Sequence, residues 1–207
     1  MNRSWSDEAE LAPGDTGGRG PVKNKPVRLA SGVILAPASS ERKTAPPGEN
    51  KWNAFVDVST DGINWDARPW IAADVNLIQP SIWESCAGVH ALMRSDAGAA
   101  YRSDSTDGGA TWGTAYKTGL PNNNSGLDVV YADGLYAVYN PVGTNWGVRT
   151  PLVASRSTDN GATWAETLIL ENAEGEYSYP SVIADDGCLH IVYTYNRQSI
   201  KYVAVSL

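Results

Sequence analysis

The 207-residue chain carries a net charge of −7 at neutral pH, because 23 Asp and Glu residues outnumber 16 Lys and Arg residues. This acidic balance makes nucleic acid and anionic membranes poor default partners, and no apolar run is long enough to cross a bilayer. The 20 glycines, 12 prolines, 8 tryptophans and 10 tyrosines, against 1 phenylalanine, are typical of short strands joined by frequent turns.

The N-terminal stretch MNRSWSDEAELAPGD has no apolar segment of the kind that signal peptides carry. The compartment therefore stays open between the cytoplasm and export. The two cysteines, Cys86 and Cys188, follow predicted strands, and we expect both to be free thiols. Because the sequence has no CxxC motif and no histidine cluster, it predicts neither a metal site nor a cofactor.

Short apolar or aromatic stretches bounded by Gly, Asp or Asn follow one another along the chain, as β-strands do. They include PSIWES (80–85), VHALMRS (89–95) and AAYRSDS (99–105), then GLDVVY (126–131), LYAVYN (135–140) and PLVASRS (151–157). A recurring phrase closes each set: STDGGATW at 105–112 and STDNGATW at 157–164, with a shorter form, STDGINW, at 59–65.

The spacing of this phrase predicts a repeat architecture. Its final tryptophans, Trp65, Trp112 and Trp164, stand 47 (112 − 65) and 52 (164 − 112) residues apart. A period of about 50 is typical of propellers, in which three strands, a turn and a fourth strand make one blade. We expect the Ser and Asp side chains to accept backbone N–H groups across the turn, Gly to take positive φ, and Trp to pack between neighbouring blades. A calcium loop would need more carboxylates.

Five longer segments extend the similarity to a known family. STDGGATW and STDNGATW match the Asp-box, or BNR repeat, of sialidase-type propellers. The chain also resembles the bacterial sialidase-like (predicted neuraminidase) glycoside hydrolases over nearly its whole length, in GPVKNKPV, IQPSIWE, LPNNNSGLD, RTPLVASRSTDNGATW and EGEYSYPSVI. The resemblance implies an all-β fold, a β-propeller of four-stranded antiparallel blades with Asp-box turns.

Family sialidases have six blades, and the sequence accounts for about four, near 22–70, 71–117, 118–170 and 171–207. We therefore expect residues 1–207 to be a single, incomplete sialidase-like propeller domain, the C-terminal portion of a larger one, although a closed four-bladed ring is the alternative. Residues 1–21, with Trp5 as the end of a truncated phrase, are expected to be the remnant of a preceding blade. An open arc would expose sheet edges and could self-associate.

The expected site lies on the rim opposite the repeated turns, where first strands begin and second strands end. Polar segments begin the first strands: NKP (24–26), QPS (79–81), NNNSGLD (122–128) and EYSYP (176–180). Counting six residues from the glycines at 88, 134 and 187 predicts that Arg94, Asn140 and Tyr193 are equivalent strand ends.

The family resemblance implies a carboxylate-binding site and a tyrosine nucleophile. Arg94 and Arg149 match the second and third of the three sialidase arginines, whose planar guanidinium groups pair with the carboxylate of the sugar. Tyr177, followed by Ser178, matches the family's Tyr-Ser pair, whereas alignment on the following proline favours Tyr179, and both stay open. A tyrosine avoids the repulsion that a carboxylate nucleophile would meet beside the sugar's own carboxylate.

Gln79 departs from the family pattern. It stands fifteen residues before Arg94, where sialidases carry the glutamate that takes the proton of the tyrosine, and Gln cannot do so. Glu84 falls farther along the strand, away from the expected face. His90 and His190 fall inside strands, so we expect them to be packed rather than catalytic. Further substrate contacts are predicted for Lys25, Asn124, Asp128, Asn140, Trp146 and Arg197, with Asn122, Asn123 and Glu41 nearby.

These residues predict an exo-acting, sialidase-like glycoside hydrolase for an acidic, carboxylate-bearing oligosaccharide or glycoconjugate, or an incomplete or inactive fragment of one. Two alternatives remain: a non-catalytic carbohydrate-binding propeller, which Gln79 favours, and a polysaccharide lyase for uronate-containing glycans, in which Tyr and His would abstract a proton. The sugar and its linkage stay open, and so does whether the chain is an enzyme.

Overall fold

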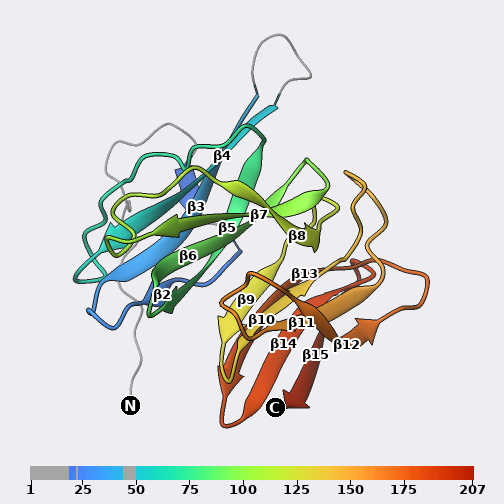
Figure 1. The fold of residues 1–207 in the computed structure, drawn as a ribbon. Helices are drawn as coiled ribbons and strands as arrows, with labels where there is room; N and C mark the ends of the chain where they lie inside the picture. The colour runs from blue at the N-terminus through green and yellow to red at the C-terminus, as the bar shows by residue number, and fades with distance from the viewer. Residues whose placement is uncertain (1–18, 22, 44–49) are drawn as a thin grey trace, which may run out of the picture.

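The computed structural model describes residues 19–21, 23–43 and 50–207, and within these ranges the chain forms β-strands and turns without a helix. The strands make four antiparallel sheets, A to D, in chain order (Figure 1). Sheets A and B, in blue to green, lie at the upper left of Figure 1, and sheets C and D, in yellow to red, at the lower right. The predicted all-β class is confirmed, and the sheets are consistent with sialidase-like propeller blades.

In sheet A, β1 and β2 pair with one edge of β3, and β4 pairs with the other edge. Its strands are β1 (Arg19–Pro21), β2 (Val27–Arg28), β3 (Ile34–Lys43) and β4 (Asn50–Ser59). Of the expected blade remnant 1–21, residues 1–18, Trp5 included, lie outside the described residues.

Sheets B and C each have four strands in sequential order. The strands of sheet B are β5 (Leu77–Ser85), β6 (Gly88–Ser95), β7 (Ala99–Ser105) and β8 (Tyr116–Pro121). Those of sheet C are β9 (Asp128–Tyr131), β10 (Leu135–Tyr139), β11 (Leu152–Ser157) and β12 (Ala165–Glu171). The boundaries expected between residues 117 and 118 and between residues 170 and 171 are wrong, because they fall inside β8 and β12.

Sheet D has three strands among the described residues: β13 (Tyr177–Asp185), β14 (Cys188–Tyr195) and β15 (Ser199–Ser206). Cys86, in the turn after β5, and Cys188, at the start of β14, are free thiols, as expected. Within the described ranges there is no helix with the length and apolarity that would cross a membrane.

Each apolar core lies between two consecutive sheets. One cluster joins sheets A and B, with Leu35 and Ala91 fully buried; the second joins B and C, with Leu92 and Leu135; the third joins C and D, where Ile191 is fully buried. Strands such as β10 are buried along their whole length, since both faces of their sheet are covered, and their sequences read as continuous apolar runs. This face-to-face succession of sheets explains the repeat.

The repeated phrases form the expected hydrogen-bonded turns. In the second turn, Ser105 Oγ accepts the backbone N–H of Gly109 at 2.8 Å, and Asp107 Oδ1 accepts that of Thr111 at 2.9 Å. Hydrogen bonds from the Thr111 hydroxyl, the Thr111 backbone N–H and the Ser105 hydroxyl lower the pKa of Asp107 to about 2. The closing Trp112 packs on the core between sheets A and B, so the turn has the structural role that its sequence predicts.

Asn160 gives the third turn an additional contact across sheets. It occupies the position of Gly108 in the second turn, and both residues have positive φ, 58° and 72°. The Asn160 side chain reaches sheet B, where its Oδ1 accepts Trp83 Nε1–H at 2.8 Å and its Nδ2 lies 3.2 Å from Ser85 Oγ. The Arg102 guanidinium also donates to the backbone carbonyl of Asn160. This residue therefore fastens the turn of sheet C to sheet B.

Replacing Asn160 with glycine is expected to lower the free energy of unfolding by about 1–3 kcal/mol, because the buried indole N–H of Trp83 would lose its acceptor. Glycine tolerates the positive φ, as Gly108 shows, so the substitution removes the side chain without straining the backbone of the turn. Chemical denaturation measures the change, with Asn64→Ala as the control, since the Asn64 amide bonds only to Asp61 in its own turn. An Asn160→Gly protein as stable as the wild type would contradict a stabilising role for the Asn160 contacts between sheets C and B.

Asp128 connects the innermost parts of all four sheets. Its carboxylate is fully buried and accepts Ser81 Oγ–H of β5 at 2.5 Å and the backbone N–H of Val182 in β13 at 2.9 Å. Lys25, just before β2, pairs with the same carboxylate at 2.8 Å. Consistent with these bonds, β9 lies against both β5 and β13. The first strands of successive sheets therefore gather at one place.

Candidate functional site

Two strained residues begin the site. Gln79 in β5 and Tyr179 in β13 each precede a proline and have positive φ values, 55° and 51°. Each also lies at a register shift of its strand pair, between Ile78 and Ser81 for Gln79 and between Ser178 and Ser181 for Tyr179. A left-handed backbone is costly for residues other than glycine and is enriched at functional sites. The matching bulges place the two side chains at equivalent positions on sheets B and D.

Arg94, at the end of β6, is a buried guanidinium beside Gln79. Its Nε donates to Asn124 Oδ1 at 3.0 Å and its Nη1 to Gln79 Oε1 at 3.3 Å, while its Cζ lies 5.8 Å from the ring centre of Trp52. Only 4% of the residue is exposed. Burial lowers the pKa of Arg94, but an arginine stays charged at neutral pH. A buried cation with neutral hydrogen-bond partners is prepared to receive an anion.

Arg149 reaches the same place from the loop before β11. Its Nη1 lies 3.3 Å from both Glu176 Oε1 and Ser178 Oγ, and its Cζ stands 4.7 Å from the centre of the Tyr179 ring. Only 12% of its side chain is exposed. Tyr179 and Arg197 line an open pocket of about 410 Å³ together with Thr194, Gln198, Ser199 and Ile200. The two predicted arginines therefore meet at one tyrosine.

Both arginines alter the acidity of Tyr179. Burial alone would raise the pKa of this phenol, but hydrogen bonding to Arg149 and Arg94 and their positive charges outweigh burial, so its pKa lies below the usual value of 10. Tyr177 behaves in the opposite way. It is buried in the core between sheets C and D, 5.2 Å from the ring of Tyr195, and burial raises its pKa. Of the two candidates, Tyr179 is the one beside the arginines.

A spectrophotometric titration of the tyrosines is expected to contain a component from Tyr179 at lower pH than an ordinary phenol, because Arg149 and Arg94 lower its pKa. Tyr179→Phe should remove that component, and Arg149→Ala should move it to higher pH, because the phenolate would lose a neighbouring positive charge. Tyr177→Phe is the matched control and should leave the component in place, since the pKa of Tyr177 is raised. A low-pH component that persists in Tyr179→Phe would contradict the assignment.

The carboxylate that accompanies Arg149 is Glu176, which the sequence analysis did not single out. Glu176 Oε1 accepts Arg197 Nε–H at 2.6 Å and lies 3.3 Å from both Arg149 and Ser178. Its place directly before the two candidate tyrosines in EYSYP was the available signal. Gln79, in turn, uses its side-chain oxygen to accept from Arg94, so the position expected for an activating glutamate holds a neutral group that orients an arginine.

Three further predicted residues lie around this cluster. Asn124 accepts from Arg94 and donates to Asn145 Oδ1 at 3.1 Å. Trp146 is 64% exposed and packs edge-on against Trp52, with 6.2 Å between ring centres. Arg197 is 65% exposed at its side chain and pairs with Glu176. An exposed indole beside buried arginines is suited to stack on a sugar ring.

Lys25, Asp128 and Asn140 have contacts of another kind. Lys25 and Asp128 bind each other in the contact that gathers the four sheets. Asn140 is fully buried and donates to the carbonyl oxygens of Pro151 and Tyr177, at 2.8 and 2.9 Å. These contacts favour structural roles, and a role in binding sugar stays a prediction for all three.

The glycine count was wrong for sheet D. Arg94 pairs with Ile78 in sheet B, and the residue that pairs with the equivalent Ser178 is Thr194, not Tyr193. Tyr193 instead lies in the core between sheets C and D and is 1% exposed. Both turns have two residues between the last paired positions, but Gly88 is itself paired, with Ser85, whereas Gly187 stands one position before Cys188, which pairs with Asp185.

The fold and the arginine–tyrosine cluster define a protein built from repeated antiparallel sheets of three or four described strands, with a polar site where the first strands meet. The BNR repeat-like domain family matches residues 1–191, and the chain belongs to this family. No protein of curated function matches the sequence. Among the described residues, no group of three or more His, Cys, Asp and Glu side chains could hold a metal ion.

Solved structures share the fold at low identity. A protein of unknown function from Dyadobacter fermentans is 21% identical, with a TM-score of 0.72 over 88% of this chain and 52% of that one. Trypanosoma rangeli sialidase in complex with sialic acid is 16% identical, with a TM-score of 0.62 over 87% of this chain and 30% of that one. The intramolecular trans-sialidase from Ruminococcus gnavus, in complex with oseltamivir carboxylate, is 16% identical, with a TM-score of 0.61 over 91% and 43%. The chain spans about half or less of each.

Proposed function

We propose that the chain carries the carboxylate-binding and nucleophile part of a sialidase-like glycoside hydrolase that is exo-acting on an acidic glycan. The observation that carries this proposal is the meeting of Arg94 and Arg149 at Tyr179, on adjoining ends of strands from three sheets. In the same proposal, residues 1–207 form one domain whose four sheets are blades of a β-propeller with Asp-box turns. Exposed sheet edges in such an arc would allow self-association.

The chemistry follows from the charges around Tyr179. Arg94 and Arg149 offer planar guanidinium groups that pair with a carboxylate through charge-assisted hydrogen bonds. With the carboxylate held there, the neutral oxygen of Tyr179 can approach the adjacent anomeric carbon without charge repulsion. The lowered pKa of Tyr179 supports this role, since the phenol gives up its proton more readily as its oxygen attacks. Trp146 would cover a face of the sugar.

A second function, binding without turnover, is favoured by Gln79. This side chain occupies the position at which family members carry the proton-accepting glutamate, and its oxygen is occupied by Arg94. A lyase is not supported, because its histidine would have to lie beside the tyrosine. His90 bonds to Ser85 and Asp104 in sheet B, and His190 bonds to Tyr202 in sheet D.

Release of 4-methylumbelliferone from its sialic acid glycoside, measured together with sialic acid binding by calorimetry, separates the two functions. The hydrolase predicts fluorescence that Tyr179→Phe abolishes while binding persists, because Phe keeps the ring and removes only the nucleophilic oxygen. Binding without fluorescence in the wild type identifies the binding function. If neither sialic acid nor glucuronic acid binds, both are overturned.

A further inference from the structure

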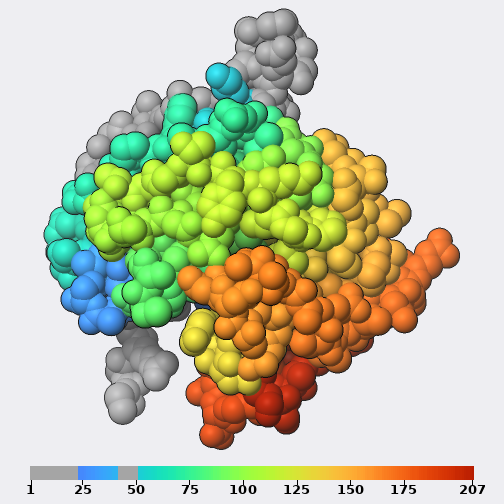
Figure 2. Space-filling model, viewed as in Figure 1, coloured from blue at the N-terminus to red at the C-terminus, as the bar shows by residue number. Residues whose placement is uncertain are grey.

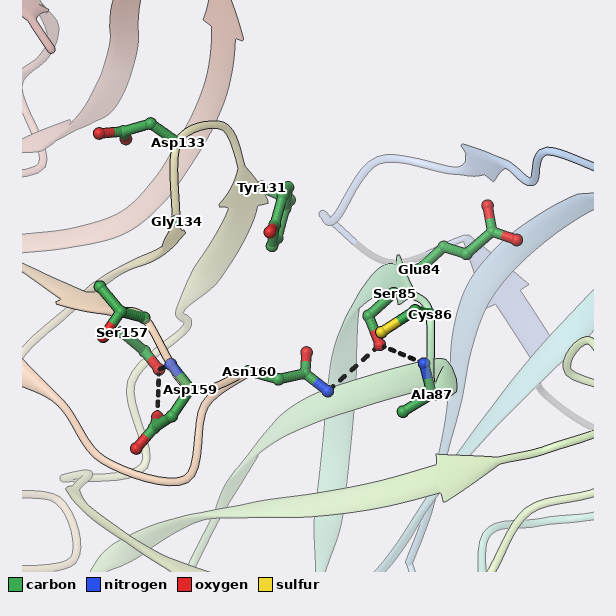
Figure 3. A pocket seen from close by; sticks show the side chains of 11 residues that line it. Glu84, Ser85, Cys86, Ala87, Tyr131, Asp133, Gly134, Ser157, Asp159 and Asn160 are labelled. Carbon is green, nitrogen blue, oxygen red and sulfur yellow. Dashed lines mark hydrogen bonds between the residues drawn. The ribbon is translucent and has the colours of Figure 1, made fainter.

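A second groove lies between sheets B and C, on the side of the repeated turns. It has a volume of about 520 Å³ and is bounded by the β5–β6 turn (84–87), the β9–β10 turn (131–134) and the third repeated turn (157–160). Figure 2 shows the hollow between the green surface of sheet B and the yellow and orange surface of sheet C. In Figure 3, Asn160 extends across the groove toward Ser85. None of the residues around Tyr179 lines it.

The hydrogen bonds of Asn160 fix the tautomer of His90. Trp83 Nε1–H can only donate, so the Asn160 oxygen faces Trp83 and its NH₂ group faces His90 Nε2, 3.0 Å away. His90 Nε2 must therefore accept, and the ring proton lies on Nδ1. That proton is donated to Asp104 Oδ1 at 2.5 Å. His90 is 97% buried, since only 3% of it is exposed.

The hydroxyl of Ser85 has one partner for its proton. Ser85 Oγ accepts from the backbone N–H of Ala87 at 3.1 Å and from Asn160 Nδ2 at 3.2 Å. Both of these groups are donors, so the Ser85 O–H is left to donate to His90 Nε2 at 2.7 Å. Ser85 is half-buried and lines the groove. Its oxygen thus combines access from the groove with a neutral imidazole as base.

Asp104 is held in place to orient His90. Arg102 Nε donates to its Oδ1 at 2.8 Å, and the Tyr116 hydroxyl donates to its Oδ2 at 2.9 Å. Arg102 Nη2 lies 3.0 Å from His90 Nδ1, and both nitrogens carry hydrogen. The positive charge of Arg102 therefore opposes protonation of the His90 ring. Burial first, and then this charge, lower the pKa of His90. The imidazole is therefore neutral at pH 7, as a general base must be.

We propose that Ser85, His90 and Asp104 form a second catalytic site that hydrolyses a short-chain carboxylic ester. Ser85 Oγ attacks the ester carbonyl carbon while its proton moves to His90 Nε2, and Asp104 stabilises the imidazolium. The bond to the leaving alkoxide breaks as His90 returns the proton to it, which leaves an acyl-serine. Water then attacks the acyl carbon, giving its proton to His90, and His90 returns a proton to Ser85 Oγ as the bond from that oxygen to the acyl carbon breaks, which releases a carboxylic acid and free Ser85.

The groove limits the ester that would fit. The side chains of Glu84, Asp133 and Asp159 bound it and disfavour an anionic substrate, whereas the exposed Tyr131 ring offers apolar contact. The donors available to stabilise a developing oxyanion are the Ala87 N–H and the Asn160 amide, both within hydrogen-bonding distance of Ser85 Oγ. We therefore infer a neutral or cationic ester with a small acyl group, a different class from the acidic glycan at Tyr179.

Labelling with a rhodamine fluorophosphonate, which reacts with activated serines, tests the proposal in a Cys86→Ala background that removes the exposed thiol beside Ser85. One label is expected per chain, at Ser85 by peptide mapping, and Ser85→Ala should lose it. Hydrolysis of p-nitrophenyl acetate should fall about 100-fold in Ser85→Ala, the lower end of what general-base activation of a nucleophile contributes.

The controls separate activation from accessibility. Ser31→Ala, which removes an exposed turn serine outside the groove, should leave label and rate unchanged. Asp104→Asn should slow labelling at Ser85 although the serine stays in place, and thermal melting checks that each variant is folded. A Cys86→Ala protein that takes up no label, or a label that survives in Ser85→Ala, would overturn the proposal whatever the variants' stability.

Discussion

Replacing Arg149 with alanine is expected to weaken the binding of sialic acid about 10- to 100-fold, as measured by isothermal titration calorimetry. A hydrogen bond to a charged group contributes about 1.5–3 kcal/mol, and each 1.4 kcal/mol is about tenfold in affinity. Arg149 is mostly buried, with 12% of its side chain exposed, so water would compensate poorly for its lost hydrogen bonds to the sugar. Arg149→Lys should give an intermediate affinity, because an ammonium keeps the charge but loses the bidentate geometry.

Arg156 provides a matched control at the other end of β11. It pairs with Asp133 at 2.9 Å and its Cζ lies 5.8 Å from the Tyr136 ring centre, much as Arg149 pairs with Glu176 and lies over Tyr179. Arg156→Ala removes the same charge and a similar packing contact from a place outside the candidate site, so affinity should not change. Equal affinities for the Arg149→Ala protein and the wild type would contradict the proposal that Arg149 binds the carboxylate of the sugar.

Replacing Asp128 with alanine is expected to lower the free energy of unfolding by about 3–5 kcal/mol, because a buried ion pair would lose one partner. The carboxylate is fully buried, and it satisfies Ser81, the backbone of Val182 and Lys25. Urea denaturation followed by tryptophan fluorescence measures the loss. Asp128→Asn should cost less, since its amide oxygen can keep one of these bonds.

Asp133→Ala is the control for this prediction. Asp133 also pairs with a cation, Arg156, but 55% of its side chain is exposed, and an exposed pair contributes about 0–1 kcal/mol. If Asp128→Ala and Asp133→Ala were equally mild, the buried carboxylate would not be what joins the inner strands, and the common meeting point of the four sheets would need another cause.

The local features of the fold could be predicted from the sequence. The turns at 105–112 and 157–164 depend on hydrogen bonds between residues a few positions apart, so their own sequence specifies their geometry. The strands between them follow from short apolar runs with turn residues at both ends. Arg94 and Arg149 were identified as site residues by resemblance, and both lie beside Tyr179. The choice between Tyr177 and Tyr179 needed the structure, because a bulge decides which side chain leaves the sheet.

What could not be predicted depends on partners far apart in the chain. Asp128 reads as a sugar ligand at a strand start, but its partners come from Lys25, Ser81 and Val182. Asn160 is the single residue at which the third repeated turn differs from the second, where Gly108 stands. Its hydrogen bond with Trp83 forms only when sheets B and C are packed together. Tyr193 was misplaced because the glycine used as the reference stands one position earlier in the β13–β14 turn than in the β5–β6 turn, which shifts a residue count by one.

A crystal structure of the chain with sialic acid tests the central claim most directly. The account predicts electron density for the sugar with its carboxylate between Arg94 and Arg149, its anomeric carbon facing the Tyr179 oxygen, and Trp146 against the ring. A sugar bound elsewhere, or guanidinium groups of Arg94 and Arg149 that face separate surfaces, would contradict it.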